Sequence, residues 1–258
     1  VRNIVVQFKE KKNIWGKPLN YKTAVNGVSF CVAQNETLGL VGESGCGKTT
    51  LGRAILGLIK PQKGEIFLHG KNLMSLTDAD KKIISKQLQV VFQDPYGSLN
   101  PRLTIAEALT EPMAVHGLLS GKRQREEKAV LLMEKVNIKA DFLKRYPHQF
   151  SGGQRQRICI ARALSVDPSF IIFDESVSAL DVSVQMHILQ LIDELKNSQQ
   201  FTSIFISHDL SVVHYISNSI MVMNQGKMVE TGTADEIFYH PKNEYTRQLI
   251  DAIPGKNL

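Results

Sequence analysis

The chain has 258 residues, of which 43% are hydrophobic and 22% are charged, a composition that excludes an intrinsically disordered protein and suits one sizeable α/β domain with an inserted subdomain. It contains no run of about 18 or more apolar residues, so we expect no membrane-spanning helix. The net charge of +6 comes from scattered basic residues, and the densest basic run, 122–125, is followed at once by Glu126 and Glu127. This pattern is typical of a solvated helix face, so we expect no nucleic-acid partner.

The first eight residues alternate apolar and polar side chains, as a strand does, and do not resemble a signal peptide. Because Val1 already lies inside this strand pattern, we expect a piece trimmed from a longer chain. Three cysteines, Cys31, Cys46 and Cys159, lie far apart and show neither metal-binding spacing nor a disulfide framework. Such cysteines suit a reducing compartment, so we expect a cytosolic protein.

Farther along the chain, the hydrophobic pattern predicts alternating strands and helices. Strands are expected at 24–32, 36–41, 65–69, 87–92, 170–173, 202–207 and 220–224. Helices are expected at 48–58, 104–116, 122–136, 154–164, 182–196 and 210–216. The alternation predicts a largely parallel sheet covered on both faces, and the helical stretch 94–164 predicts a separate lobe inserted into that core.

The segment 42–50 matches the phosphate-loop pattern G-x-x-x-x-G-K-[ST], with an apolar strand before it and a helix after it. Its candidate nucleotide-binding residues are Gly42, Ser44, Gly45, Cys46, Gly47, Lys48, Thr49 and Thr50. The glycines allow successive N–H groups to face a phosphate, Lys48 neutralises phosphate charge, and the Thr49 hydroxyl can bind Mg²⁺. The alternative is a glycine-rich turn that binds no nucleotide.

Two carboxylates, Asp174 and Glu175, follow the apolar run 170–173. The carboxyl end of a parallel strand faces the ligand crevice. We therefore expect Asp174 to hold Mg²⁺ through water and Glu175 to polarise the attacking water. The alternative is a plain strand end that carries two solvated acids.

His208 and Gln93 also follow short apolar strands. His208 is placed to reach the γ-phosphate of a nucleotide, and Gln93 to sense Mg²⁺ or the attacking water. Taken singly, each side chain also suits a purely structural role.

Ser151, Gly152, Gly153 and Gln154 lead directly into an expected helix. Two consecutive glycines predict irregular backbone before the helix and free N–H groups at its start. With a serine hydroxyl beside them, these groups form a natural anion site.

In this order along the chain, the motifs resemble the nucleotide-binding subunit of an ATP-binding cassette (ABC) transporter, and the resemblance covers essentially the whole chain. It implies the following roles: 42–50 as the Walker A loop for ATP, Asp174 as the Walker B aspartate, Glu175 as the catalytic base, His208 as the switch histidine and Gln93 as the Q-loop glutamine. Thr49, Gln93 and Asp174 become the Mg²⁺ residues. Ser151–Gln154 becomes the signature, which completes the ATP site of a second subunit, and Asp181 closes the loop that contacts that subunit. Tyr21 is the candidate for stacking on adenine, and Trp15 is the second choice.

The resemblance implies an α/β P-loop NTPase core with a mostly parallel sheet, an antiparallel β portion and an inserted helical subdomain. We expect the nucleotide-binding core and β-subdomain at 1–93 and 165–228, the helical signature subdomain at 94–164 and a C-terminal tail at 229–258.

A finer resemblance, to the peptide/nickel importer branch, rests on 93–102, on 181–185 and on the tail from His240-Pro241 to Tyr245-Thr246. It implies an F-type ATPase subunit at the cytoplasmic face of the membrane. The implied partners are a non-identical D-type ATPase subunit or a second identical copy, two permease subunits and, indirectly, a solute-binding protein. Ser176-Val177 departs from the usual Pro-Thr, which leaves peptide and nickel-type cargo both open. No cysteine follows Pro254, so the iron–sulfur motif of many relatives is missing from this sequence.

Two other functions remain as alternatives. The first is a soluble cassette ATPase that acts in translation or DNA repair, although such proteins usually join two cassettes or insert a long coiled coil. The second is a regulatory protein that binds a nucleotide without hydrolysing it. The presence of both Glu175 and His208 makes this alternative the weaker one.

Overall fold

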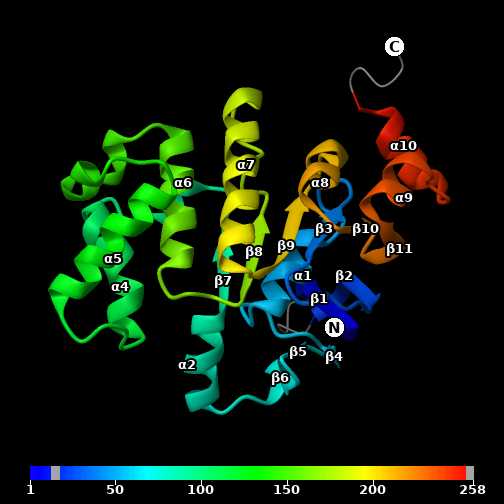
Figure 1. Cartoon of the computed structure of the whole chain (residues 1–258). Helices are drawn as coiled ribbons and strands as arrows, with labels where there is room; N and C mark the ends of the chain where they lie inside the picture. Colours follow the sequence, from blue (N-terminus) through cyan, green and yellow to red (C-terminus); the bar gives the residue numbers. More distant parts are fainter. Residues whose placement is uncertain (13–17, 254–258) are drawn as a thin grey trace. The chain divides into compact units, whose positions relative to one another are not determined.

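The computed structural model describes residues 1–12 and 18–253, which form two compact units (Figure 1). The first unit comprises Val1–Thr77 and Ile204–Leu258, and the second comprises Asp78–Ser203. The division into core, helical subdomain and tail that the sequence suggests follows other boundaries and stays a prediction.

The first unit contains antiparallel and parallel strands. β1 (Arg2–Lys12) pairs with β2 (Pro18–Val28) and with β4 (Lys63–Glu65), both antiparallel. A short hairpin joins β5 (Phe67–Leu68) to β6 (Lys71–Asn72). The other strands of this unit lie in the order β11 (Lys227–Thr233), β10 (Ser219–Asn224), β3 (Thr37–Val41) and β9 (Thr202–Ser207). β10 runs parallel to β3 and antiparallel to β11.

Helices follow these strands at the positions that carry the motifs. The chain passes from β3, whose residues are all buried, through the phosphate-loop segment into α1 (Lys48–Ile55). α8 (Leu210–Ile216) follows β9, and α9 (Ala234–Tyr239) and α10 (Glu244–Asp251) follow β11. A 3₁₀ turn, η1 (Leu73–Ser75), follows β6.

The second unit contains two parallel strands and a group of helices. β7 (Leu88–Val91) and β8 (Phe170–Asp174) pair in parallel, with Val91 opposite Phe173. The helices are α2 (Asp78–Gln87), α3 (Pro95–Ser98), α4 (Ile105–Val115), α5 (Lys122–Lys135), α6 (Gly152–Leu164) and α7 (Val182–Gln199). Two 3₁₀ turns, η2 (Ala140–Lys144) and η3 (Pro147–Gln149), lie between α5 and α6. α4, α5 and α6 gather together in Figure 1 and bury Leu109, Met133 and Ile158.

The predicted mixture of parallel and antiparallel strands with helices is confirmed, with local corrections. The strand expected at 65–69 is divided at Ile66 between β4, which ends at Glu65, and β5, and β5 stops at Leu68 because His69 and Gly70, with φ of 48° and 78°, form a turn. The strand expected at 24–32 spans Pro18–Val28. Within the described residues, 1–12 and 18–253, no helix is both long and apolar enough to cross a bilayer.

Candidate functional site

The phosphate-loop segment joins β3 to α1 in a conformation that requires glycine at two positions. Gly47, the N-cap residue of α1, has a φ of 111°, which side-chain-bearing residues rarely adopt. A Cβ atom on Gly47 would lie 2.2 Å from the carbonyl oxygen of Ala24. A Cβ on Gly42 would lie 2.1 Å from the carbonyl oxygen of Met223. The surrounding backbone therefore leaves the loop no room for other residues at these two positions.

The ammonium group of Lys48 is held by the loop that precedes it. Only 3% of Lys48 is exposed, and its Nζ donates hydrogen bonds to the carbonyl oxygens of Gly42 at 2.6 Å and Glu43 at 3.0 Å. Its remaining contact, 3.9 Å to Sγ of Cys46, is weak. An ammonium has three N–H donors, so Lys48 can keep both carbonyl contacts and donate to a phosphate oxygen.

Cys46 is a buried thiol inside the same loop, with 7% of the residue exposed. Burial raises the pKa of Cys46, and the nearby positive charge of Lys48 offsets part of that increase. The thiol is therefore protonated at neutral pH and contributes a small apolar side chain to the loop.

The two acidic residues predicted from the sequence lie at the C-terminal end of β8. Asp174 ends the strand and is only 6% exposed, and Glu175 follows it with a φ of 49°. A left-handed backbone is uncommon outside glycine and is found often at functional sites. Ser178 holds this conformation, because its backbone N–H and its Oγ both donate to the carbonyl oxygen of Glu175, at 3.1 and 2.9 Å.

Gln93, which lies beyond the end of β7, is linked to Glu175 through the same serine. Its side-chain Nε2 donates to Oγ of Ser178 at 3.3 Å. Sequence reasoning did not identify Ser178 as a site residue. The available signal was its position three residues after Glu175, from which a serine side chain commonly bonds back to the backbone.

The segment that follows Gln93 is anchored to α6. The guanidinium of Arg155 lies 3.7 Å from the ring centroid of Tyr96, and Arg162 donates a short hydrogen bond to the carbonyl oxygen of Ser98. Arg155 is only 6% exposed, and its Nε also donates to the carbonyl oxygen of Pro147 at 2.7 Å. These contacts link the Gln93 segment to the helix that begins with the signature.

The signature residues form the first turn of α6. Ser151 is the N-cap, and its Oγ accepts a hydrogen bond from the N–H of Gln154 at 3.3 Å, while Oε1 of Gln154 accepts from the N–H of Ser151 at 3.0 Å. A hydroxyl has one donor and two acceptor positions, so the Ser151 O–H remains able to donate to an anion. The first turn carries no acidic side chain, which leaves the positive end of the helix dipole unopposed.

The expectation that Gly152 and Gly153 lie before the helix is wrong, because both are inside its first turn. A capping box started by Ser151 nucleates the helix in spite of the glycines. The two glycines differ in their surroundings. A Cβ on Gly153 would lie 2.5 Å from Cγ1 of Val184, whereas a Cβ on Gly152 would lie 3.7 Å from Leu180. Gly153 therefore permits close packing, and packing does not require Gly152.

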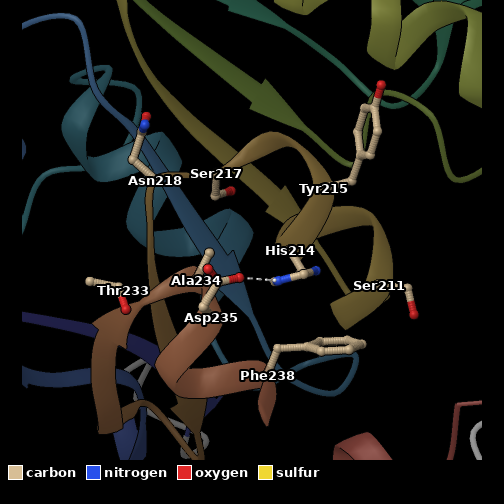
Figure 2. A pocket seen from close by; sticks show the side chains of 9 residues that line it. All are labelled: Ser211, His214, Tyr215, Ser217, Asn218, Thr233, Ala234, Asp235 and Phe238. Carbon is tan, nitrogen blue, oxygen red and sulfur yellow. Dashed lines mark hydrogen bonds and ion pairs between the residues drawn. The ribbon is translucent and has the colours of Figure 1, made fainter.

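His208 is exposed just after β9, directly before the N-cap of α8, and that helix is held firmly from α9. Nε2 of His214 lies 2.8 Å from Oδ1 of Asp235, and the His214 ring stacks on Phe238 with centroids 4.2 Å apart (Figure 2). These residues line a pocket of about 500 Å³ together with Ser211 and Tyr215. The contacts fix the helix that follows His208.

The remaining predicted residues have the following positions. Tyr21 is 54% exposed on β2, opposite Lys9, whereas Trp15 lies outside the described residues. Asp181 is the exposed N-cap of α7. Thr49 and Thr50 follow Lys48 in the first turn of α1. The first unit thus holds Tyr21, the loop residues 42–50 and His208, and the second holds Gln93, Asp174, Glu175, the signature and Asp181.

Comparison with known proteins gives closely related matches. A family model described as ABC transporter matches residues 25–178. The dipeptide transport ATP-binding protein DppF of Haemophilus influenzae is 48% identical over 247 residues, which cover 96% of this chain and 75% of that protein. The oligopeptide transport ATP-binding protein OppF of Bacillus subtilis is 46% identical over 251 residues, or 97% of this chain and 82% of that protein.

A similar solved structure is the dimeric post-hydrolysis state of the ATP-binding cassette MJ0796 bound to ADP and Pi. It superposes with a TM-score of 0.78 at 27% identity and covers 90% of this chain and 97% of that chain.

Proposed function

Because this chain belongs to the ABC transporter family, we propose that it is the ATP-hydrolysing subunit of a membrane importer that takes up oligopeptides or dipeptides. The ATPase assignment rests on the phosphate loop. There the buried Lys48 ammonium donates hydrogen bonds to two loop carbonyl oxygens, and its third N–H can donate to a phosphate oxygen. The similar cassette that was solved with ADP and Pi supports the same ligand.

We propose that a magnesium ion is bound together with ATP, because the candidate residues carry the donor groups that this ion prefers. Mg²⁺ prefers oxygen ligands, keeps several waters and commonly takes one or two carboxylates plus substrate phosphates. Asp174 offers a carboxylate, Thr49 a hydroxyl and Gln93 an amide oxygen, which stays available because Gln93 bonds to Ser178 through its nitrogen. When bound, the ion neutralises charge on the phosphates.

Hydrolysis requires a base, and Glu175 is our candidate. A positioned carboxylate can orient the attacking water and accept its proton. Ser178 holds the backbone of Glu175 through its carbonyl oxygen, at the residue whose carboxylate we propose as the base. We propose that His208 donates a hydrogen bond to the γ-phosphate and that Tyr21 stacks on the adenine.

The signature favours an ATP site shared between two subunits. Its Ser151 O–H and the positive end of α6 suit the γ-phosphate of ATP bound to a second ATPase subunit, and Asp181 contacts that subunit. The dimeric form of the similar cassette supports this arrangement. We propose a D-type partner, with a second copy of this chain as the alternative.

The importer assignment rests on relatives whose names specify peptide transport. It implies two permease subunits, an extracytoplasmic solute-binding protein that acts through them, and a peripheral location at the cytoplasmic face of the membrane. A nickel-type chelate is the second candidate cargo, because Ser176-Val177 departs from the peptide pattern.

The test is transport by the assembled complex. The chain, a D-type subunit and a permease pair are reconstituted in proteoliposomes with a solute-binding protein, and uptake of labelled dipeptide, oligopeptide or nickel chelate is measured with and without ATP. We expect ATP-dependent peptide uptake that Glu175→Gln abolishes. ATP hydrolysis that no cargo stimulates, in a complex that binds no permease, would favour the soluble ATPase alternative.

A further inference from the structure

The side chain of Tyr245 reaches the phosphate loop from the C-terminal part of the first unit. Its hydroxyl oxygen accepts a hydrogen bond from the backbone N–H of Glu43 at 3.0 Å, across 202 positions of sequence. Glu43 is the second residue of the loop, at the point where the chain leaves β3. The contact is therefore made at the base of the loop, away from the glycine N–H groups that suit a phosphate.

The helix that carries Tyr245 is firmly attached to β11. The Asn243 side chain caps α10 by accepting from the N–H of Tyr245 at 2.9 Å. The Glu230 carboxylate accepts from the N–H groups of Lys242 at 2.7 Å and Asn243 at 3.2 Å. Since Glu230 belongs to β11, these hydrogen bonds attach the start of α10 to the sheet, and the backbone of Tyr245 is held in place.

Glu43 connects this hydroxyl to the lysine of the loop. Its N–H is bound by Tyr245, and its carbonyl oxygen accepts from Lys48 Nζ at 3.0 Å and from the N–H of Cys46 at 3.3 Å. Glu43 is thus held on both sides, by α10 and by the residues that suit phosphate binding. If the Tyr245 contact is lost, Glu43 becomes less constrained, and its carbonyl oxygen holds the Lys48 ammonium less firmly.

We propose that Tyr245 is a positioning residue for nucleotide binding, whose hydroxyl fixes Glu43 so that Lys48 stays over the phosphate loop. This inference rests on the proposed function of the loop. Burial raises the pKa of Tyr245, and the charge of Glu43 adds to the increase. The phenol is therefore neutral at physiological pH and keeps its O–H while it accepts from Glu43.

The test uses the full chain with Tyr245→Phe, which removes only the hydroxyl. Its matched control is Tyr239→Phe, at an exposed tyrosine of α9. ATP affinity is measured with a fluorescent ATP analogue, and the rate of Cys46 alkylation without nucleotide reports the closure of the loop. We expect Tyr245→Phe to weaken binding by about threefold to tenfold, as the loss of one hydrogen bond implies, and to speed Cys46 alkylation. In the assembled transporter, kcat at saturating ATP should stay close to wild type, and the KM for ATP should rise.

Two further variants make each outcome decisive. Tyr245→Leu removes the ring as well as the hydroxyl. If ATP binding weakens only in the Leu variant, Tyr245 acts through packing of its ring. Its hydroxyl then does not position the loop, and the proposal is overturned. Unchanged affinity and unchanged alkylation in Tyr245→Phe overturn it too. Lys48→Ala tests the proposed function separately, because undiminished ATP binding by that variant shows that the loop is not the nucleotide site.

Discussion

The Gln93 side chain is joined to Ser178 by a 3.3 Å hydrogen bond, and the same serine Oγ donates to the carbonyl oxygen of Glu175 at 2.9 Å. One hydroxyl thus connects Gln93, two residues beyond the end of β7, with the proposed catalytic base directly after β8. Because Gln93 also begins the segment anchored to α6, Ser178 ties the position of Glu175 to the helix that carries the signature.

We expect Ser178→Ala to lower kcat of the assembled transporter severalfold and to leave ATP affinity close to wild type. The alanine removes both side-chain hydrogen bonds and loosens the left-handed backbone of Glu175. Steady-state ATPase measurements and nucleotide titrations check this. Ser176→Ala is the matched control, because the buried Ser176 Oγ has no hydrogen-bond partner among the residues that the structure describes. Equal kcat in the two variants would show that Ser178 has no special role.

Glu175→Gln should retain ATP binding and lose turnover. Removing a general base typically costs about 10²–10⁴ in rate, whereas the amide keeps the shape of the side chain. Single-turnover hydrolysis in the assembled transporter measures the loss. Glu43→Gln, at an exposed glutamate whose backbone carbonyl accepts from Lys48, is the control. Wild-type hydrolysis by Glu175→Gln would assign the base to another residue.

Alkylation of Cys46 should be slow at neutral pH, accelerate as pH rises and decrease when ATP is bound. The thiolate is the reactive form, and burial raises the pKa of Cys46, so a smaller fraction is ionised at a given pH than for an exposed thiol. Cys31 is exposed and should react first, and Cys159, whose pKa burial raises to about 12, should react last. Mass spectrometry of labelled peptides at several pH values measures all three. Full ATP affinity after complete alkylation of Cys46 would exclude contact between this loop and the nucleotide.

Sequence reasoning located the elements that combine a strong hydrophobic pattern with a motif, and it missed the helices α2 and α10. α10 buries only Thr246 and Ile250, and α2 buries only Ile84, so each offers few buried apolar residues from which a helix can be predicted. Both are instead stabilised by contacts with their surroundings, such as the Glu230 carboxylate at the start of α10.

The candidate site shows the same limit. Lys48, Asp174 and Glu175 belong to local motifs and can be identified from neighbouring residues alone. The bond from Tyr245 to Glu43 joins residues 202 positions apart, and no local pattern encodes such a contact. Ser178 is close to Glu175 in sequence, yet its bond to Gln93 depends on the pairing of β7 with β8.

ATP hydrolysis by the isolated chain should be weak and should rise more than linearly with protein concentration. This follows if the signature of one subunit completes the site of another, because only dimers then hydrolyse ATP. ATPase activity measured over a wide range of chain concentrations, and again with the D-type partner added, checks the expectation. Fast turnover whose specific rate is independent of concentration would contradict a shared site.

The two signature glycines should respond differently to alanine. In Gly153→Ala the new methyl group would lie 2.5 Å from Val184, so we expect a loss of about 1–3 kcal/mol in the free energy of unfolding, as is typical of overpacking. In Gly152→Ala the nearest atom is 3.7 Å away, and alanine is the better helix former, so the free energy of unfolding should not fall. ATPase activity of the assembled transporter should nevertheless fall in Gly152→Ala, because the methyl group occupies the surface that approaches the nucleotide of the partner subunit. Denaturant unfolding and ATPase assays on both variants separate the two effects. Full activity of Gly152→Ala would place the signature backbone away from the partner's ATP.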